Sequence, residues 1–367
     1  MSGSPSAGQS GSTLTELGDI LQCRWENIQK ARQTTETALN ALSKIIEGKP
    51  GPDSSVIVHG SLARRECTQG SDLDWTLLFD GQADASIQQT FLAIKRSLGD
   101  PEIYSGLGLR EPGREGTFGT LAFSQPMMQY IGGEEDSNSN TTRRVLLLLE
   151  ALPVGERCDA FERVRSGILE RYLDEDRGLL RTSLVEKHVR WVPLFLLNDF
   201  ARYWRTMAVD FAYKQFDRGN QGYALHSIKL GLSRMLFASG LLACFWCDPA
   251  ISRNENQEPK KQSLINCLGS FFDRTPLERL VLFFMVQISA SDSGFLRKTA
   301  TDLFRSYDAF IGLLDDPEKR KHLDELSPED ENADKLFIEA RTMRRSFRLA
   351  VQDMFFGRRF TASRTQH

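Results

Sequence analysis

The sequence predicts an α+β fold, with a small N-terminal α/β unit built on a mixed sheet and a large C-terminal all-helical domain. Residues 55–125 contain short apolar runs of strand length, separated by polar turns, with one helical segment near 86–98. From about residue 141 onward, apolar side chains recur almost throughout at helical spacing. No motif recurs at the length of a solenoid repeat, so the second region is expected to be a helical bundle.

Composition describes an ordinary soluble globular protein. The chain has 367 residues, which is enough for two domains, with 40% hydrophobic and 26% charged residues. A net charge of −3 gives no general attraction for nucleic acid or membranes, although a local basic groove would still permit nucleic acid as a partner. No apolar run is expected to reach the roughly 18 residues that cross a bilayer. Six scattered cysteines favour free thiols and a cytoplasmic location.

The predicted organisation follows the order of the chain. Residues 1–12 are rich in Gly and Ser and are expected to form a flexible tail. Residues 13–48 show helical spacing that stops at Gly48 and Pro50, and this leading helix is expected to pack on the sheet. The predicted boundaries are a tail at 1–12, an N-terminal domain at 13–140, a helical domain at 141–357 and a basic tail at 358–367.

The most informative pattern lies between residues 56 and 79. A short apolar strand is followed by Gly60 and Ser61, then by a polar helical segment and a second strand that begins Ser-Asp-Leu-Asp. Because side chains alternate along a strand, Asp72 and Asp74 are expected to point the same way. Two neighbouring carboxylates repel each other unless a cation lies between them, and hard oxygen ligands of this kind suit Mg²⁺.

The turn before the two aspartates has the chemistry of a phosphate site. Gly60 lets the backbone approach a ligand closely, and Ser61 offers a hydroxyl and an amide at the start of a helix. Each feature alone is common in solvated turns. Together, in register and flanked by strands of buried type, they predict a nucleotide site.

This pattern resembles the signature of the DNA polymerase β-type nucleotidyltransferase superfamily, in which Gly-Ser is followed by Asp-x-Asp. It is most similar to the bacterial uridylyl- and adenylyltransferases of nitrogen control. The matching residues are Gly60, Ser61, Arg64, Arg65, Glu66, Ser71, Asp72 and Asp74. Ala63 stands where those relatives often have glycine. The resemblance covers residues 56–80 and bears on the reaction type more than on the acceptor.

The resemblance implies transfer of a nucleoside monophosphate from a nucleoside triphosphate, such as ATP, to an acceptor, with release of pyrophosphate. Asp72 and Asp74 would be catalytic and would hold Mg²⁺ or Mn²⁺ in a two-metal arrangement. The implied nucleotide-binding residues in this region are Gly60, Ser61, Arg64, Arg65 and Ser71. The acceptor could be a protein, an RNA end, a nucleotide or a small molecule. Likeness to protein-modifying relatives favours a protein slightly, and a stress or phage-defence role would fit.

A third carboxylate on a later strand normally completes such a site. The strand-like runs at 103–109 and 117–124 contain no acid between apolar residues. The candidates are Glu111, Glu115, Asp136 and Glu150. Glu150 ends a helical run, and we expect it to pair with Arg143 or Arg144 on that helix. Without a third acid the alternative function is a non-catalytic, nucleotide-binding regulatory or interaction protein.

The second domain is predicted to consist of helices joined by short connections. The expected helices lie near 156–174, 181–217, 222–246, 276–290, 294–315 and 333–356. The polar segment 132–140 is expected to be a loop, with Thr141 or Thr142 capping the next helix. The charged segment 315–334 is expected to be an exposed connection.

Two groups in the second domain have richer chemistry than packing requires. Lys229 and Ser233 lie one turn apart, and in many superfamily members a lysine and a serine of the second domain reach the triphosphate. Arg202 or Arg205 could supplement them. The alternative is an ion-paired helix face.

The remaining cysteines and histidines are expected to be structural. Cys244 and Cys247 end an apolar helical run with no histidine or second cysteine pair nearby, so core packing is favoured over zinc or dithiol chemistry. The five histidines are isolated in the sequence, and none pairs at metal-ligand spacing.

Overall fold

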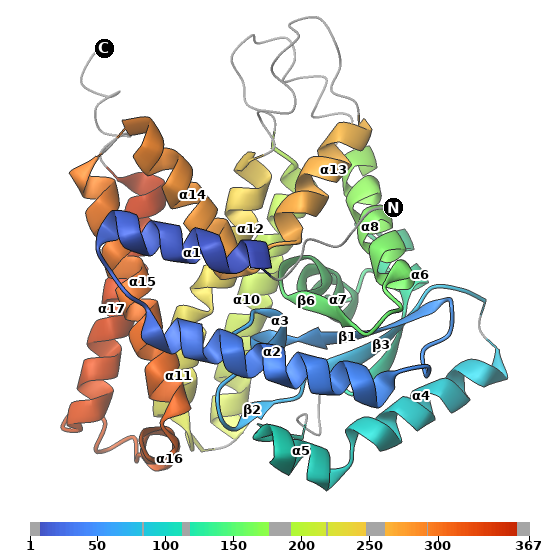
Figure 1. Cartoon of the computed structure of the whole chain (residues 1–367), viewed down its shortest axis with the longest axis horizontal. Coiled ribbons are helices and arrows are strands. Elements are labelled where there is room, and N and C mark those ends of the chain that lie inside the picture. The colour runs from blue at the N-terminus through green and yellow to red at the C-terminus, as the bar shows by residue number, and fades with distance from the viewer. Residues whose placement is uncertain are drawn as a thin grey trace, which may run out of the picture. The chain divides into compact units, whose positions relative to one another are not determined.

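The fold is α+β, with a small mixed sheet and many helices (Figure 1). The computed structural model describes residues 8–82, 84–111, 118–175, 192–217, 219–246, 261–291 and 293–357. The chain divides into two compact units, each assembled from separate segments. Unit 1 comprises residues 1–31, 207–239 and 276–367, and unit 2 comprises residues 32–206 and 240–275. The sequence boundary at residue 140 stays a prediction.

Unit 2 contains the sheet. Its four strands run in the order β5 (Thr120–Phe123), β3 (Trp75–Phe79), β1 (Ser54–His59) and β6 (Ala151–Val154). β1 pairs antiparallel with both β3 and β6, and β3 pairs parallel with β5, so the sheet is mixed as predicted. A separate two-residue ladder joins β2 (Ser71–Asp72) to β4 (Leu109–Arg110) in parallel.

Helices cover the two faces of this sheet. Val56 and Val58 of β1 face a core that includes Ala38, Leu42 and Ile46 from α2 (Glu26–Ile46). Helix α4 (Ala85–Leu98) adds side chains to the same core, and it matches the helix expected at 86–98. The intervening residues of β1 point to the other face, where the Ser55 hydroxyl accepts a hydrogen bond from the backbone of Phe161 at 3.3 Å. Every residue of β1 is therefore buried.

The leading helix is two helices, which corrects the expectation of one helix over 13–48. α1 (Gly8–Leu21) ends where Gln22 adopts a left-handed φ of 54°. The Cys23 amide then donates to the Gly18 carbonyl at 2.9 Å, a bond that closes a helix C-terminus. The second helix, α2, stops at Ile46, close to the predicted stop at Gly48.

The expectation of a strand at 103–109 is wrong, because local capping favours a helix there. In α5 (Pro101–Leu107), Asp100 accepts a hydrogen bond from the Glu102 amide at 3.0 Å and proline occupies the first turn. Gly108, with φ 65°, ends the helix. The run at 117–124 contains β5, as expected for its described part.

Strand β6 lies in the region expected to be helical and was missed. It has only four residues and contains Pro153, which lacks a donor and is tolerated here at the edge of the sheet. The helix before it, α7 (Asn138–Leu149), is capped by Ser137 and not by Thr141 or Thr142. The other helices with residues in unit 2 are α3 (Gly60–Ala63), α6 (Ser124–Gln129), α8 (Asp159–Glu175), α10 (Leu194–Asp217), α12 (Arg234–Trp246) and α13 (Lys261–Phe272).

A buried arginine ties several of these helices together. The Arg144 guanidinium on α7 forms two hydrogen bonds to Asp136, at 2.8 and 3.0 Å, and one to Asp199 of α10 at 2.7 Å. It also donates to the Tyr172 hydroxyl of α8 at 2.8 Å. Arg144 is fully buried, so the two carboxylates compensate its charge.

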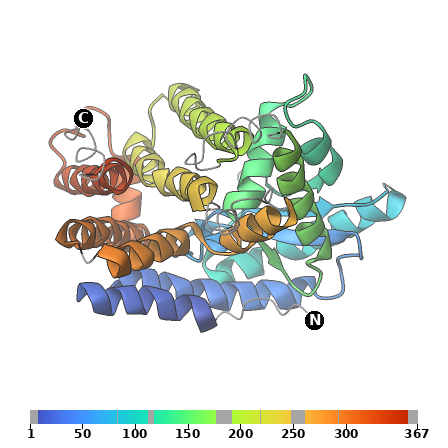
Figure 2. The same cartoon turned by 90° about the horizontal axis from the view of Figure 1, so that it is seen from above.

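The described regular elements of unit 1 are all helices. Besides α1 it contains α11 (Tyr223–Leu232), α14 (Pro276–Ser291), α15 (Gly294–Asp315), α16 (Pro317–Glu325) and α17 (Lys335–Phe356). In Figure 2 the orange α15 lies beside the red α17, and Tyr307 and Phe347 pack between them with ring centroids 5.8 Å apart. Asp308 of α15 caps the start of α2 by accepting from the Ile28 amide at 3.0 Å.

Most predicted helices of the second domain are present, with shifted ends. α16 lies inside the segment 315–334 expected to be a connection, because Asp316 caps it and Pro317 starts it. The part of 181–217 before residue 192 lies outside the described residues.

Among the described residues, Tyr223–Phe245 is one stretch long and apolar enough to cross a membrane, contrary to the expectation of none. Its most apolar window is 61% buried, as in a core helix of a soluble protein.

Candidate active site

The candidate site lies where β1 ends and β3 begins. The antiparallel register of these strands pairs Val58 with Trp75. It continues by one residue, because the His59 amide donates to the Asp74 carbonyl at 2.8 Å. Gly60 follows at once. The sheet itself therefore brings the Gly-Ser turn next to the second aspartate.

Gly60 has a backbone shape that requires glycine. Its φ is 63°, and an added Cβ would lie 3.2 Å from the Asp74 Oδ2 atom. The turn belongs to the four-residue helix α3, which is anchored by the buried side chains of Leu62 and Ala63. The Ser61 carbonyl accepts from the Glu66 amide at 2.8 Å, while the Ser61 residue stays partly exposed.

The two aspartates alternate with buried residues. Leu73 and Trp75 belong to the core beneath the sheet, whereas Asp72 is exposed and Asp74 is partly exposed. This is the pattern of two carboxylates directed to one side of an extended chain. The ladder between β2 and β4 fixes the first of them, because Asp72 stands opposite Arg110 in the register.

The two arginines after the turn are bound to carboxylates. Arg64 donates to Glu66 at 2.8 Å and also to Glu150. Arg65, which has a φ of 58°, pairs with Glu36 of α2 at 2.9 Å. The expectation that Glu150 pairs with Arg143 or Arg144 is therefore wrong. The sheet explains this pairing, since β6 begins at the residue after Glu150 and pairs with the end of β1.

Ser71 lies inside the turn that precedes the aspartates. Its hydroxyl accepts a hydrogen bond from the Thr68 amide at 3.1 Å and lies 3.3 Å from the Thr68 hydroxyl. Ser71 is buried, so it stabilises the turn that leads into Asp72. Contact between Ser71, Arg64 or Arg65 and a nucleotide stays a prediction.

His59, expected to be structural, lies at the end of β1 directly before Gly60. It is buried, and its ring lies 5.1 Å from the ring of Phe118. Burial lowers the pKa of His59 from 6.5 to about 4, although a hydrogen bond to the Glu150 backbone acts in the opposite direction. Among the described residues, its Nδ1 atom has no hydrogen-bond partner.

Of the candidates for a third carboxylate, the described Asp136 and Glu150 are ion-paired with arginines. Asp136 is bound by Arg144 and Glu150 by Arg64, Glu111 is exposed, and Glu115 lies outside the described residues. The Gly119 amide donates to the Trp75 carbonyl at 2.7 Å, which brings 118–119 alongside 74–75. Those positions hold phenylalanine and glycine. In the part of the chain that the structure describes, no group of three or more His, Cys, Asp or Glu is arranged to hold a metal ion.

The expected residues of the second domain fall in different units. Lys229 of α11 and Ser233 lie in unit 1, one turn apart, since the Ser233 amide donates to the Lys229 carbonyl at 2.9 Å. Arg202 lies in unit 2, where it donates to the Asp136 carbonyl at 3.0 Å and to Asn138 at 3.1 Å. Arg205 is exposed. Their contact with a triphosphate stays a prediction.

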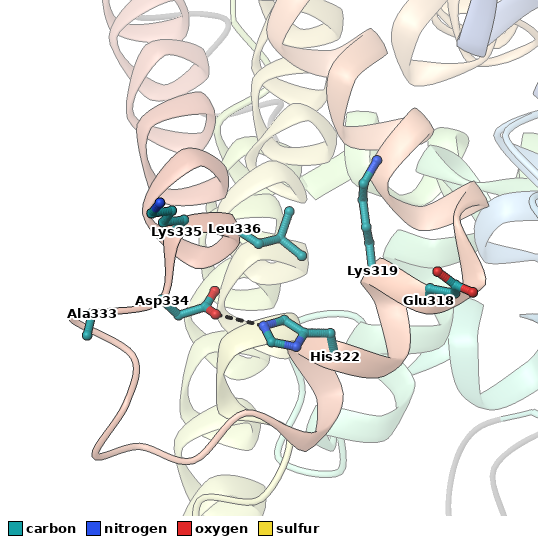
Figure 3. Close-up of a pocket in the computed structure, with 7 residues that line it drawn as sticks. All are labelled: Glu318, Lys319, His322, Ala333, Asp334, Lys335 and Leu336. Atoms are coloured by element: carbon teal, nitrogen blue, oxygen red, sulfur yellow. Dashed lines mark hydrogen bonds and ion pairs between the residues drawn. The ribbon is translucent and has the colours of Figure 1, made fainter.

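A separate pocket of about 570 Å³ lies between α16 and α17 in unit 1 (Figure 3). His322 and Asp334 face each other across it, with the His322 Nε2 and Asp334 Oδ2 atoms 2.7 Å apart. Asp334 also caps α17 by accepting from the Phe337 amide at 2.7 Å. Both polar groups thus have partners within the fold.

The cysteine pair expected to pack in the core is described in part. Cys244 is buried in α12, and Cys247 lies outside the described residues. The described cysteines, Cys23, Cys67, Cys158, Cys244 and Cys267, are free thiols.

No family model matches the chain, and no curated protein matches it. A functional assignment therefore depends on the sequence pattern and on the geometry of the Gly60–Asp74 region.

Proposed function

We propose that this protein is a Mg²⁺-dependent nucleotidyltransferase that moves a nucleoside monophosphate from a nucleoside triphosphate to an acceptor. The observation that carries the proposal is the close approach of Gly60 to Asp74, whose Oδ2 atom would lie 3.2 Å from a Cβ added at Gly60, with the exposed Asp72 two residues before Asp74. It supports a phosphate-accepting turn and a carboxylate pair within one small region. The Gly-Ser and Asp-x-Asp resemblance points to the same chemistry.

The residues fit a divalent cation such as Mg²⁺ or Mn²⁺. Asp72 and Asp74 supply hard anionic oxygens, and both are accessible to solvent to some degree. When bound, such ions neutralise phosphate charge and stabilise the attacking and leaving oxygens. Asp72 and Asp74 would hold them.

The other residues position the triphosphate. The absence of a side chain at Gly60 leaves room for phosphate oxygens beside Asp74, and the Ser61 hydroxyl can donate to one of them. In the reaction an acceptor oxygen bonds to the α-phosphorus while the bond from that phosphorus to the pyrophosphate oxygen breaks. Pyrophosphate leaves, and the acceptor oxygen loses its proton.

The acceptor we favour is a protein, as the resemblance to protein-modifying enzymes suggests, with RNA ends, nucleotides and small molecules as the other classes. The net charge of −3 supports a protein over a long nucleic acid. The proposed location is the cytoplasm, a choice supported by the free thiols of the described cysteines.

A second candidate is a nucleotide-binding regulatory protein that does not transfer the nucleotide. It is favoured by the residues that lie beside Asp74 just before β5, because Phe118 and Gly119 provide no third carboxylate. This protein would bind a triphosphate without consuming it.

The test is incubation with each of the four α-labelled nucleoside triphosphates, Mg²⁺ and cell lysate as the source of acceptor. The wild-type protein should label one class of acceptor, and Asp72→Asn and Asp74→Asn should abolish that labelling while circular dichroism stays unchanged. The exposed Asp53→Asn variant is the control and should retain transfer. Equal labelling by the wild type and both site variants would overturn the assignment. Tight binding of an unconsumed triphosphate would select the regulatory alternative.

A further inference from the structure

The last turns of helix α10 have a packed inner side and an open outer side. On the inner side, the Phe211 ring lies 6.3 Å from the ring of Tyr223 in α11, measured between centroids. Gln215, one turn further along, is buried, and its carbonyl accepts a hydrogen bond from the Asn220 amide at 2.8 Å. Side chains three or four residues apart share one side of a helix, so Phe211 and Gln215 define the side that packs within unit 1.

The outer side carries exposed apolar side chains. Four of them stand at positions i, i+3, i+4 and i+7, which places them together on one side of the helix, and we call them the α10 stripe: Val209, Ala212, Tyr213 and Phe216. Val209 is 59% exposed, Tyr213 67% and Phe216 85%. Phe216 is the most exposed large apolar side chain in the described part of the chain. Contiguous exposed apolar surface of this kind marks an interaction surface.

A charged residue stands at each end of the α10 stripe. Arg205 lies four residues before Val209 on the same side of the helix, and Asp217 is the last residue of the helix. Both charged side chains are exposed, and within the described residues neither has an ion-pair partner. Lys214, one turn before Asp217, pairs with Asp210 at 2.8 Å. The stripe is therefore basic at one end and acidic at the other, and both charges are accessible to a partner.

An antiparallel second copy of α10 has the order of groups that this surface requires. Arg205 lies four residues before Val209, and Tyr213 lies four residues before Asp217. A single antiparallel register therefore sets Val209 of one copy against Tyr213 of the other. The same register sets Arg205 against Asp217, and a twofold axis repeats both contacts. A parallel copy would place like charges together at both ends, so the charges select an antiparallel second copy of this chain as the occupant.

We propose that the α10 stripe is a self-association surface, on which two copies of the chain pair their α10 helices antiparallel about a twofold axis. The stripe supplies the apolar contact, and the Arg205–Asp217 pairs set the direction of the helices. This assigns Arg205 a partner other than the triphosphate, and it does not rest on the proposed transfer activity. Because four apolar residues on one helix bury less surface than the roughly 1,600 Å² of a standard interface, the dissociation constant is expected in the micromolar range.

The experiment is sedimentation velocity of the full chain between about 1 and about 100 μM, at low salt so that the end charges are not screened. The wild-type chain should shift from monomer to dimer over this range. Phe216→Ser and Tyr213→Ser should each raise the dissociation constant about tenfold or more, because each removes apolar contact in both copies. Both side chains are exposed, so circular dichroism and the thermal midpoint should stay unchanged. Val286→Ser, at a 44% exposed position on α14, is the control and should change the dissociation constant by less than about twofold.

Charge exchange tests the direction of pairing. Arg205→Glu sets a second carboxylate against Asp217 of the other copy, and Asp217→Lys sets a second cation against Arg205, so each should raise the dissociation constant about threefold or more. The double variant restores opposite charges at both ends and should return to within about twofold of the wild-type dissociation constant. A chain that stays monomeric at about 100 μM, or equal dimerisation by Phe216→Ser and wild type, would overturn the proposal. A double variant that dimerises no more tightly than the single variants would also overturn it.

Discussion

Gly60 closely approaches Asp74 at the end of the β1–β3 pair: a methyl group on Gly60 would lie 3.2 Å from the Asp74 Oδ2 atom. The backbone bond from the His59 amide to the Asp74 carbonyl fixes this approach. A strand pairing therefore places the Gly60–Ser61 turn beside the Asp74 carboxylate.

The first prediction concerns this contact. Gly60→Ala should destabilise the fold by about 1 kcal/mol, because an L-residue is strained at φ 63°. It should also reduce nucleotide transfer by roughly tenfold or more, because the methyl group crowds Asp74. Gly48→Ala is the matched control, since Gly48 has φ 68° and open space around it. It should cost similar stability and leave transfer unchanged. Equal transfer by the two variants would show that the contact has no functional role.

The second prediction separates the two neighbouring arginines. Arg64→Gln leaves the buried carboxylates of Glu66 and Glu150 without their cation and should cost about 3 kcal/mol of unfolding free energy. Arg65→Gln removes a pair with Glu36, which is 40% exposed, and should cost less than about 1 kcal/mol. Urea denaturation at neutral pH measures both. Equal losses of unfolding free energy in the two variants would mean that the ion pairs of Arg64 do not stabilise the packing of the turn against the start of β6.

The third prediction is a pH dependence that His59 produces. Its pKa is about 4 in the folded protein and 6.5 in the unfolded chain, so the unfolded state takes up the proton first as the pH falls. Stability is full above pH 6.5 and should fall by about 3 kcal/mol between pH 6.5 and pH 4. His59→Gln should lack this component. The difference between wild-type and variant unfolding free energies, measured in EDTA, isolates it, and parallel pH profiles would contradict the assignment.

Local patterns predicted much of the fold. The apolar run that became β1 and the helical periodicity of α4 are read from neighbouring residues, and both are present. Strand β6 was not predicted because it is four residues long and contains Pro153. It also gains its stability from pairing with a strand about ninety residues earlier. Helix α5 was not predicted because its capping residues, Asp100 and Gly108, favour a helix, whereas the apolar pattern between them indicates a strand.

The candidate site was likewise predicted only in part. The Gly-Ser turn and the alternation around Asp72 and Asp74 follow from short sequence spacing and are present in the structure. The partner of Glu150 was not predictable from its own helix, because Arg64 reaches it only after β6 has paired with β1. The contact between α11 and α17, where Arg344 donates to the Ser227 carbonyl, likewise joins segments more than one hundred residues apart in sequence.

The most direct test of the central claim is Mn²⁺ binding in the presence of ATP, followed by electron paramagnetic resonance of the free ion. The wild-type protein should bind Mn²⁺ at a site that Asp72→Asn and Asp74→Asn each weaken by about tenfold or more. Mn²⁺ binding with the same affinity in the wild type and in both variants would contradict the account.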